Sequence, residues 1–351
     1  MSTAAEASEV KLKSKDFQTD QDVRWCPGCG DYSILANVQR FLPGLGEEPH
    51  RYVFVSGIGC SSRFPYYMNT YGFHTIHGRA PALATGIKTA NPDLSVWMVT
   101  GDGDALSIGG NHIIHALRRN LDIVVLLFNN RIYGLTKGQY SPTSEVGKVT
   151  KSTPFGSVDQ PINPLTLALG ANASFVARTL DVDAKHSLQI FEEANNHRGT
   201  SFIEIYQNCN IFNDGTFDSV RDRASRVEHQ LLVEHGQPLI FGKDRDRGIS
   251  ISAHGPEVIS FAANDEQAAI AAGVTVFDRS NRLHAHAIAE IDRKPEFPVA
   301  MGVFYQQKRD TFDAVMQGQF HGSDEEKPSE PHDIDATLSD LFQTGDTWMV
   351  G

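Results

Sequence analysis

The chain has 351 residues, of which 40% are hydrophobic and 21% charged, so disordered and fibrous classes are excluded and about two domains are expected. Its 43 acidic and 31 basic residues give a formal net charge of −12, which predicts no nucleic-acid partner. No apolar run approaches the roughly 18 residues that span a membrane, and residues 1–20 lack the apolar segment of a secretory signal. We therefore expect a cytoplasmic protein with no membrane contact.

Residues 1–21 are polar and lack apolar periodicity, which predicts a flexible N-terminal arm. Apolar runs and helical patterns then alternate over 22–215. The runs predict strands over 51–56, 94–100, 122–128, 173–177 and 202–206. The helical patterns cover 80–90, 109–119 and 183–197. Near-continuous apolar strands separated by helices predict an α/β fold with a doubly wound, mostly parallel sheet covered on both faces.

The rest of the chain has a different pattern. Residues 136–163 are rich in Gly, Pro, Ser and Thr without clear periodicity, and a loop of this length is usually functional. A smaller C-terminal α+β extension is predicted over 216–320. Its expected strands are 239–241, 248–252 and 300–305, and its expected helices are 265–272 and 283–293. Residues 321–351 predict an acidic linker and a C-terminal tail.

Two polar motifs follow consecutive predicted strands, GDGD at 101–104 and NN at 129–130. Ligands of such sheets bind beyond the carboxyl ends of the strands, and glycines let the backbone approach a phosphate closely. Each motif alone is also typical of a turn. Together they predict a diphosphate and Mg²⁺, held by Asp102, Asn130 and the carbonyl of Ile132. A Rossmann nucleotide site is disfavoured because no G-x-G-x-x-G opens a helix after the first strand.

The chain has four cysteines, too few for a disulfide scaffold. Cys26 and Cys29 form a C-x-x-C pair, whereas Cys60 and Cys209 are isolated and lie just after predicted strands. Four thiolates could bind zinc or an iron–sulfur cluster. Buried free cysteines are the alternative for the isolated pair.

In combination, these motifs resemble the thiamine-diphosphate-binding β subunits of the 2-oxoacid:ferredoxin oxidoreductases, and most closely the 2-oxoglutarate synthase branch. The resemblance covers about residues 22–215. The matching segments are 25–35 (WCPGCGDYSIL), 57–67 (GIGCSSRFPYY), 74–88 (HTIHGRAPALATGIK), 101–112 (GDGDALSIGGNH), 129–139 (NNRIYGLTKGQ) and the isolated Cys209. It implies a reversible, CoA-dependent oxidative decarboxylation of a 2-oxo acid, with electrons passed to ferredoxin. The branch it resembles most implies the conversion of 2-oxoglutarate to succinyl-CoA.

The resemblance also assigns residues to cofactors. Asp102, Asn130 and Ile132 would hold Mg²⁺, and all four cysteines would hold a [4Fe–4S] cluster. The residues expected around thiamine diphosphate are Ile58, Gly59, Cys60, Ser61, His77, Gly101, Gly103, Asp104, Ala105, Asn130, Tyr133, Gly134, Leu135 and Thr136.

Three positions are predicted to be catalytic. Leu135 would wedge under the bent cofactor, and His77 would complete its pocket, although a strand-end histidine with a structural role is the alternative. Arg63 would pair with a substrate carboxylate, and a purely structural arginine is an equally open interpretation. His112 and His115 lie three apart on a predicted helix without a third ligand nearby, so we expect no metal there.

No segment resembles the pyrimidine-binding half that supplies the glutamate of thiamine enzymes. The resemblance therefore implies a separate α subunit, an (αβ)₂ heterotetramer, ferredoxin as electron acceptor, and a 2-oxo acid and coenzyme A as substrates. Three alternatives stay open: a pyruvate or branched-chain 2-oxoacid enzyme, a non-redox thiamine-dependent decarboxylase subunit, and a zinc-stabilised scaffold subunit.

Overall fold

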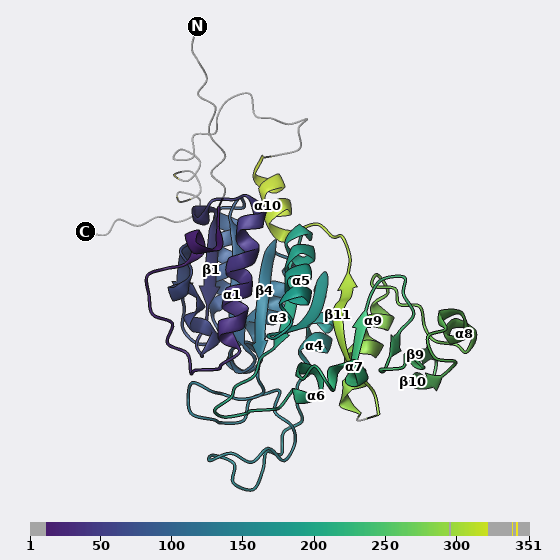
Figure 1. The fold of residues 1–351 in the computed structure, drawn as a ribbon. Coiled ribbons are helices and arrows are strands. Elements are labelled where there is room, and N and C mark those ends of the chain that lie inside the picture. The colour runs from purple at the N-terminus through teal and green to yellow at the C-terminus, as the bar shows by residue number, and fades with distance from the viewer. Residues whose placement is uncertain (1–11, 295, 322–338, 340–341, 343–351) are drawn as a thin grey trace. The chain divides into compact units, whose positions relative to one another are not determined.

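The computed structural model describes residues 12–294 and 296–321, together with Ser339 and Phe342. Residues 1–313 form one compact unit and residues 314–351 a second. The predicted acidic linker and tail over 321–351 therefore lies almost wholly outside the described residues, as do residues 1–11 of the predicted arm. Figure 1 shows the fold of the first unit, which carries the motifs identified above.

An eight-stranded sheet of order β2-β1-β3-β4-β6-β5-β11-β7 forms the centre of the first unit. The strands are β1 (Tyr52–Ser56), β2 (Tyr71–His74), β3 (Ser95–Gly101), β4 (Ile123–Asn129), β5 (Phe175–Leu180), β6 (Ser201–Tyr206), β7 (Gln230–Val233) and β11 (Val299–Gln306). Neighbouring strands run parallel except β5 and β11. The predicted doubly wound, mostly parallel sheet is confirmed, and the five predicted strands correspond to β1, β3, β4, β5 and β6.

Helices cover both faces of this sheet. Those of the α/β part are α1 (Asp31–Phe41), α2 (Ala80–Ala90), α3 (Gly110–Arg119), α4 (Pro164–Gly170) and α5 (Ala184–Asn196). One hydrophobic core packs α1 and α5 against one face, the near face in Figure 1, and a second packs α2, α3 and α4 against the other. Alternate residues of one strand pack into different cores: in β1, Phe54 packs with α1 and α5, and Val55 packs on the opposite face.

The predicted C-terminal extension contributes to two sheets. Strand β11 pairs with β5 and β7, so both β7 and β11 belong to the central sheet. A separate antiparallel sheet contains β8 (Ile240–Phe241), β9 (Arg247–Ser252) and β10 (Gly255–Ser260). The helices of this region are α6 (Asp218–Arg221), α7 (Arg226–His229), α8 (Glu266–Ala271), α9 (Arg282–Glu290) and α10 (Phe312–His321). The pattern at 300–305 predicted a strand but not its partners, because pairing between distant segments leaves no local signal.

The predicted N-terminal arm differs from the structure where it is described. A short 3₁₀ helix spans Ser14–Phe17, and the Phe17 side chain is fully buried with its ring edge-on to Tyr52, at a centroid distance of 5.8 Å. One apolar residue in a polar segment is enough to anchor it. No helix among the described residues is long and apolar enough to cross a lipid bilayer.

Candidate active site

The carboxyl ends of β1, β3 and β4 meet at one edge of the sheet, and the loops that follow them enclose a cavity. The residues that line it are Asp31, Ile58, Gly59, Cys60, Ser61, His77, Gly101, Asp102, Gly103, Asp104, Phe128, Asn130, Ile132, Tyr133, Gly134, Leu135 and Thr136. Residues from five separate segments of the chain therefore converge on one place. The edge is the one at which ligands of doubly wound sheets bind.

The lining includes every residue predicted to contact the cofactor or Mg²⁺ except Ala105, which is buried behind it. Asp31 and Phe128 were not predicted, since the first opens a helix and the second belongs to a buried strand. Arg63 does not line the cavity; its Nη1 donates a hydrogen bond to the carbonyl of Arg24 at 2.8 Å. Arg63 lies on the 3₁₀ helix Ser61–Tyr67, which begins at the cavity wall.

Asp104 lines the cavity and holds its neighbouring segments in place through hydrogen bonds. Its Oδ1 accepts hydrogen bonds from the backbone N–H of Ile58 at 3.1 Å and of Gly78 at 2.7 Å, and lies 2.5 Å from Nδ1 of His77. Its Oδ2 accepts from the Thr100 hydroxyl at 2.7 Å. Both oxygens are therefore engaged within the protein, and this carboxylate fixes the loop after β1 and the orientation of the His77 ring.

Gly103 is required by a close approach of two loops. A Cβ at this position would lie 2.1 Å from the Tyr133 ring, and the Tyr133 hydroxyl donates to the Gly103 carbonyl at 3.0 Å. The GDGD turn and the segment after β4 are thus packed in direct contact. Both sequence motifs line the same cavity.

Asp102 is a buried carboxylate of the GDGD turn that lines the cavity. Its Oδ2 accepts hydrogen bonds from the hydroxyls of Ser141 at 2.5 Å and Thr143 at 2.6 Å, both in the long loop 136–163. Burial raises the pKa of Asp102 to about 6, although these two hydrogen bonds lower it. A buried carboxylate with a raised pKa gains stability from a bound cation, since the cation compensates the charge.

A tight turn holds the second pair of predicted magnesium ligands. Arg131 has a φ of 55°, and Asn130 Oδ1 accepts a hydrogen bond from the backbone N–H of Ile132 at 3.1 Å. Asn130 Nδ2 donates to Gln207 Oε1 at 2.8 Å, so the amide orientation is fixed. Carboxylate, amide and carbonyl oxygens form a donor set that suits Mg²⁺.

The cysteines lie beside this cavity, and none forms a disulfide. A Cβ on Gly134 would lie 3.5 Å from Sγ of Cys209 and 3.6 Å from Sγ of Cys60, so these two sulfurs flank Gly134. Burial raises the pKa of Cys60 to about 12, and the nearby charges of Asp31, Cys209 and Cys26 raise it further. Burial also raises the pKa of Cys29, with Asp31, Cys60 and Cys209 adding to it.

All four thiols thus interact electrostatically. As they stand, however, no three His, Cys, Asp or Glu residues in the described part of the chain are placed to hold a metal ion. The Gln207 amide donates to Cys29 Sγ at 3.2 Å, which links the thiols to the turn that carries Asn130. The donor chemistry fits a thiolate-bound metal group, because Cys29 and Cys60, whose pKa values burial raises, ionise only when a cationic centre compensates them.

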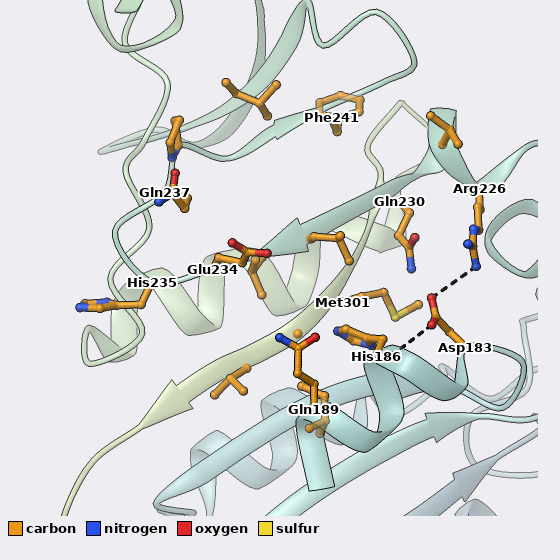
Figure 2. A pocket seen from close by; sticks show the side chains of 18 of the residues that line it. Asp183, His186, Gln189, Arg226, Gln230, Glu234, His235, Gln237, Phe241 and Met301 are labelled. Carbon is orange, nitrogen blue, oxygen red and sulfur yellow. Dashed lines mark hydrogen bonds and ion pairs between the residues drawn. The ribbon is translucent and has the colours of Figure 1, made fainter. Parts of the chain in front are cut away.

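A larger cavity of about 1170 Å³ lies away from these motifs, between α5 and the segments around β7 and β8. Figure 2 shows its side chains, among them Asp183, which pairs with Arg226 at 3.3 Å. Arg279 pairs with Glu193 at 2.7 Å, and Arg245 with Glu266 at 3.1 Å. These three lining arginines are thus paired with neighbouring acids.

Comparisons with known proteins agree with this geometry. The family described as "Thiamine pyrophosphate enzyme, C-terminal TPP binding domain" matches residues 57–205. The chain is 52% identical to the 2-oxoglutarate oxidoreductase subunit KorB of Mycobacterium tuberculosis, over 96% of this chain and 88% of that protein. It is 46% identical to 2-oxoacid:ferredoxin oxidoreductase 1, subunit beta, of Aeropyrum pernix, over 60% of this chain and 67% of that protein.

A comparison with a solved structure agrees with these sequence matches. The 2-oxoglutarate:ferredoxin oxidoreductase from Magnetococcus marinus, with 2-oxoglutarate, coenzyme A and succinyl-CoA bound, aligns with a TM-score of 0.73 and 31% identity. The alignment covers 95% of this chain and 97% of that chain. The likeness therefore extends well beyond the thiamine-binding part, into the region after residue 215.

Proposed function

This chain belongs to the β subunits of the 2-oxoacid:ferredoxin oxidoreductases, KorB type, and from that premise we propose that its substrate is 2-oxoglutarate. In the proposed reaction 2-oxoglutarate, coenzyme A and two oxidised ferredoxins give succinyl-CoA, CO₂, two reduced ferredoxins and a proton. The observation that carries the proposal is the single cavity at which the GDGD turn, the NN turn and Cys60 meet. Similarity to enzymes named for 2-oxoglutarate supports the choice of substrate.

Mg²⁺ and the diphosphate of thiamine would be held by this cavity. Asp102, Asn130 and the Ile132 carbonyl would ligate the metal, and Gly103 leaves room for the Tyr133 ring to pack against the GDGD turn. When bound, thiamine diphosphate supplies the nucleophilic carbon and the electron sink for decarboxylation. The protein's own contribution is to orient that group. Asp104 fixes the His77 ring, and Leu135 lines the cavity and would wedge under the bent cofactor.

A [4Fe–4S] cluster would be held by Cys26, Cys29, Cys60 and Cys209, and would carry electrons from the cavity to ferredoxin. The position of Cys60 supports this assignment, because it is both a cavity residue and an electrostatic neighbour of the other three thiols. Zinc at the same thiols could not accept electrons. Free cysteines and an oxygen-sensitive cluster both fit a cytoplasmic location.

Further partners are proposed because no segment of this sequence resembles a pyrimidine-binding half. A separate α subunit would supply that half, so that the active site would be completed at the interface between the two chains. An (αβ)₂ heterotetramer is the assembly proposed, with ferredoxin as a transient partner. Exposed apolar side chains beside the cavity, among them Leu135 and Ile76, are consistent with a covered surface.

The test uses the chain co-purified anaerobically with its α subunit. We expect 2-oxoglutarate and coenzyme A together to drive the reduction of ferredoxin, with about four iron atoms and four acid-labile sulfides per β chain. Pyruvate and branched-chain 2-oxo acids are measured in parallel. Faster turnover of one of these would replace the substrate assignment, CO₂ release without electron transfer would favour a non-redox decarboxylase, and zinc without labile sulfide would favour a scaffold.

A further inference from the structure

We propose that Ser141 and Thr143 are positioning residues that orient Asp102 toward the metal, and that the long loop 136–163 is thereby part of the cofactor site. The inference rests on the proposed magnesium and thiamine diphosphate site. It concerns residues outside every motif that predicted that site. It also gives the loop a function beyond connecting β4 with α4.

The contacts are short, buried and directed at one oxygen. Both hydroxyls donate to Oδ2 of Asp102, from 2.5 Å for Ser141 and 2.6 Å for Thr143. All three side chains are at most 4% exposed, so water does not compete for these bonds. Hydrogen bonds to a metal-ligating carboxylate fix its rotation and its ligating face. The backbone N–H groups of Asp102 and Gly103 also interact with this carboxylate, so the two hydroxyls are its side-chain donors.

A second set of contacts fixes Thr143 itself. Its Oγ1 lies 2.9 Å from Asn129 Oδ1, and Asn129 Nδ2 donates to Glu204 Oε1 at 2.7 Å. Because Glu204 is a carboxylate, only the amide nitrogen of Asn129 can face it, and the amide oxygen faces Thr143. The single hydroxyl proton of Thr143 therefore lies between two acceptors, of which the Asp102 carboxylate is the closer. Glu204 in turn accepts a hydrogen bond from Arg178 Nε at 2.7 Å. The fully buried ion pair between β5 and β6 therefore orients the Asn129 amide, whose oxygen lies against the hydroxyl that binds Asp102.

The same loop also contacts the turn that carries the other predicted ligands. The Ser144 hydroxyl donates to the carbonyl of Arg131 at 2.6 Å and accepts from the backbone N–H of Ser141 at 2.8 Å. Arg131 lies between Asn130 and Ile132. One short stretch of loop thus touches both the GDGD side and the NN side of the cavity, and sets the distance between them.

The test measures metal and cofactor binding rather than turnover. The holo complex is stripped with chelator, and Mg²⁺ is titrated by calorimetry at fixed thiamine diphosphate. Replacing Thr143→Val removes the hydroxyl at nearly constant volume, and we expect the apparent Mg²⁺ affinity to fall 10- to 100-fold, the usual effect of losing a contact to a metal ligand. Thr143→Ser restores the hydroxyl and should bind within about threefold of the natural protein.

Two controls separate this role from a general loss of stability. Thr150→Val makes the same change in the same loop, where the hydroxyl contacts Ser152 and Thr153 instead of Asp102, and should leave the affinity unchanged. If Thr143→Val fails to fold, Ser141→Ala removes the other hydroxyl that binds Asp102. Natural affinity in a folded Thr143→Val or Ser141→Ala complex overturns the inference. Failure of the natural complex to bind Mg²⁺ with thiamine diphosphate overturns the proposed site instead.

Discussion

Two carboxylates only two positions apart have different tasks at this site. Asp104 uses both oxygens to bind groups of the protein, from the Ile58 N–H to the Thr100 hydroxyl. Asp102 accepts hydroxyls at Oδ2 and faces the cavity. Both side chains line the cavity, so the difference lies in their hydrogen-bond partners. The sequence analysis assigned Asp102 to the metal and Asp104 to the cofactor, but it did not predict that Asp104 binds groups of the protein.

The motifs located the residues that line the cavity, because they combine residue types that few structures require together; the roles of these residues stay predictions. Prediction from the sequence failed for Ser141 and Thr143, because serine and threonine in a loop are common and carry no spacing that marks a contact with Asp102. Asp31 was missed for a related reason, since an acidic residue at the start of a helix has an ordinary capping interpretation. Its burial, which raises its pKa to about 7, is visible only in three dimensions.

Arg63 is the residue for which we predict a role in substrate choice. It lies on the 3₁₀ helix that begins at the cavity wall, and one of its five N–H donors binds the Arg24 carbonyl. Enough donors are left to bind a carboxylate bidentately. We expect Arg63→Met to raise the KM for 2-oxoglutarate about 10- to 100-fold, the effect of losing a charged hydrogen-bonded pair, while the KM for pyruvate changes little.

Steady-state kinetics of the complex with both substrates would measure this difference. Arg24→Met is the matched control, because its guanidinium is exposed and pairs with Asp22, while its backbone carbonyl is kept. Equal losses on the dicarboxylic and the monocarboxylic substrate would show that Arg63 is structural.

At the scale of elements, the sequence predicted where strands lie along the chain but not which strands are neighbours in the sheet. Apolar runs located β1, β3, β4, β5 and β6, because buried parallel strands need continuous apolar side chains. Strand β2 gave no such signal, since all four of its residues are exposed. The membership of β7 and β11 in the central sheet was also missed, as it depends on contacts between segments far apart in the sequence.

The end of α5 provides a pH-dependent element. His197 follows the helix, and its Nε2 lies 2.7 Å from the Ser174 hydroxyl, which binds Asn120. Burial lowers the pKa of His197 to about 4, with Asp122 opposing and Arg309 adding to the shift. Between pH 6.5 and 4, the unfolded chain takes up a proton here that the folded chain does not. The free energy of unfolding should therefore fall as the pH decreases through this range, by about 2 kcal/mol at pH 5.

Urea unfolding of the full chain at pH 7.5 and pH 5.0 would measure this loss. In His197→Gln the protonation is removed while a hydrogen-bonding side chain is kept, so the loss should be smaller by about that amount. His254→Gln, at an exposed turn histidine, should behave as the natural chain does. An unchanged pH dependence in His197→Gln would contradict the assignment.

At the scale of the whole molecule, the cofactor-binding half of an active site is present in one chain. The cavity gathers the predicted diphosphate and metal ligands, and the α subunit proposed above would supply the glutamate that activates thiamine through its pyrimidine ring. Leu135 and Ile76 are 43% and 73% exposed, which places apolar surface at the cavity rim. A second polypeptide that covers this rim would both bury that surface and exclude water from the reaction.

The isolated chain, loaded with Mg²⁺, thiamine diphosphate and reconstituted cluster, is therefore expected to release no CO₂ from 2-oxoglutarate above the rate of the cofactors in buffer. Adding the separately purified α subunit should restore turnover in proportion to the complex formed, measured by labelled CO₂ release alongside size-exclusion chromatography. Cofactor binding to the isolated chain, followed by calorimetry, serves as the control that the half-site is intact. Turnover by the chain alone would mean that its own residues activate the cofactor, and the requirement for an interface would be wrong.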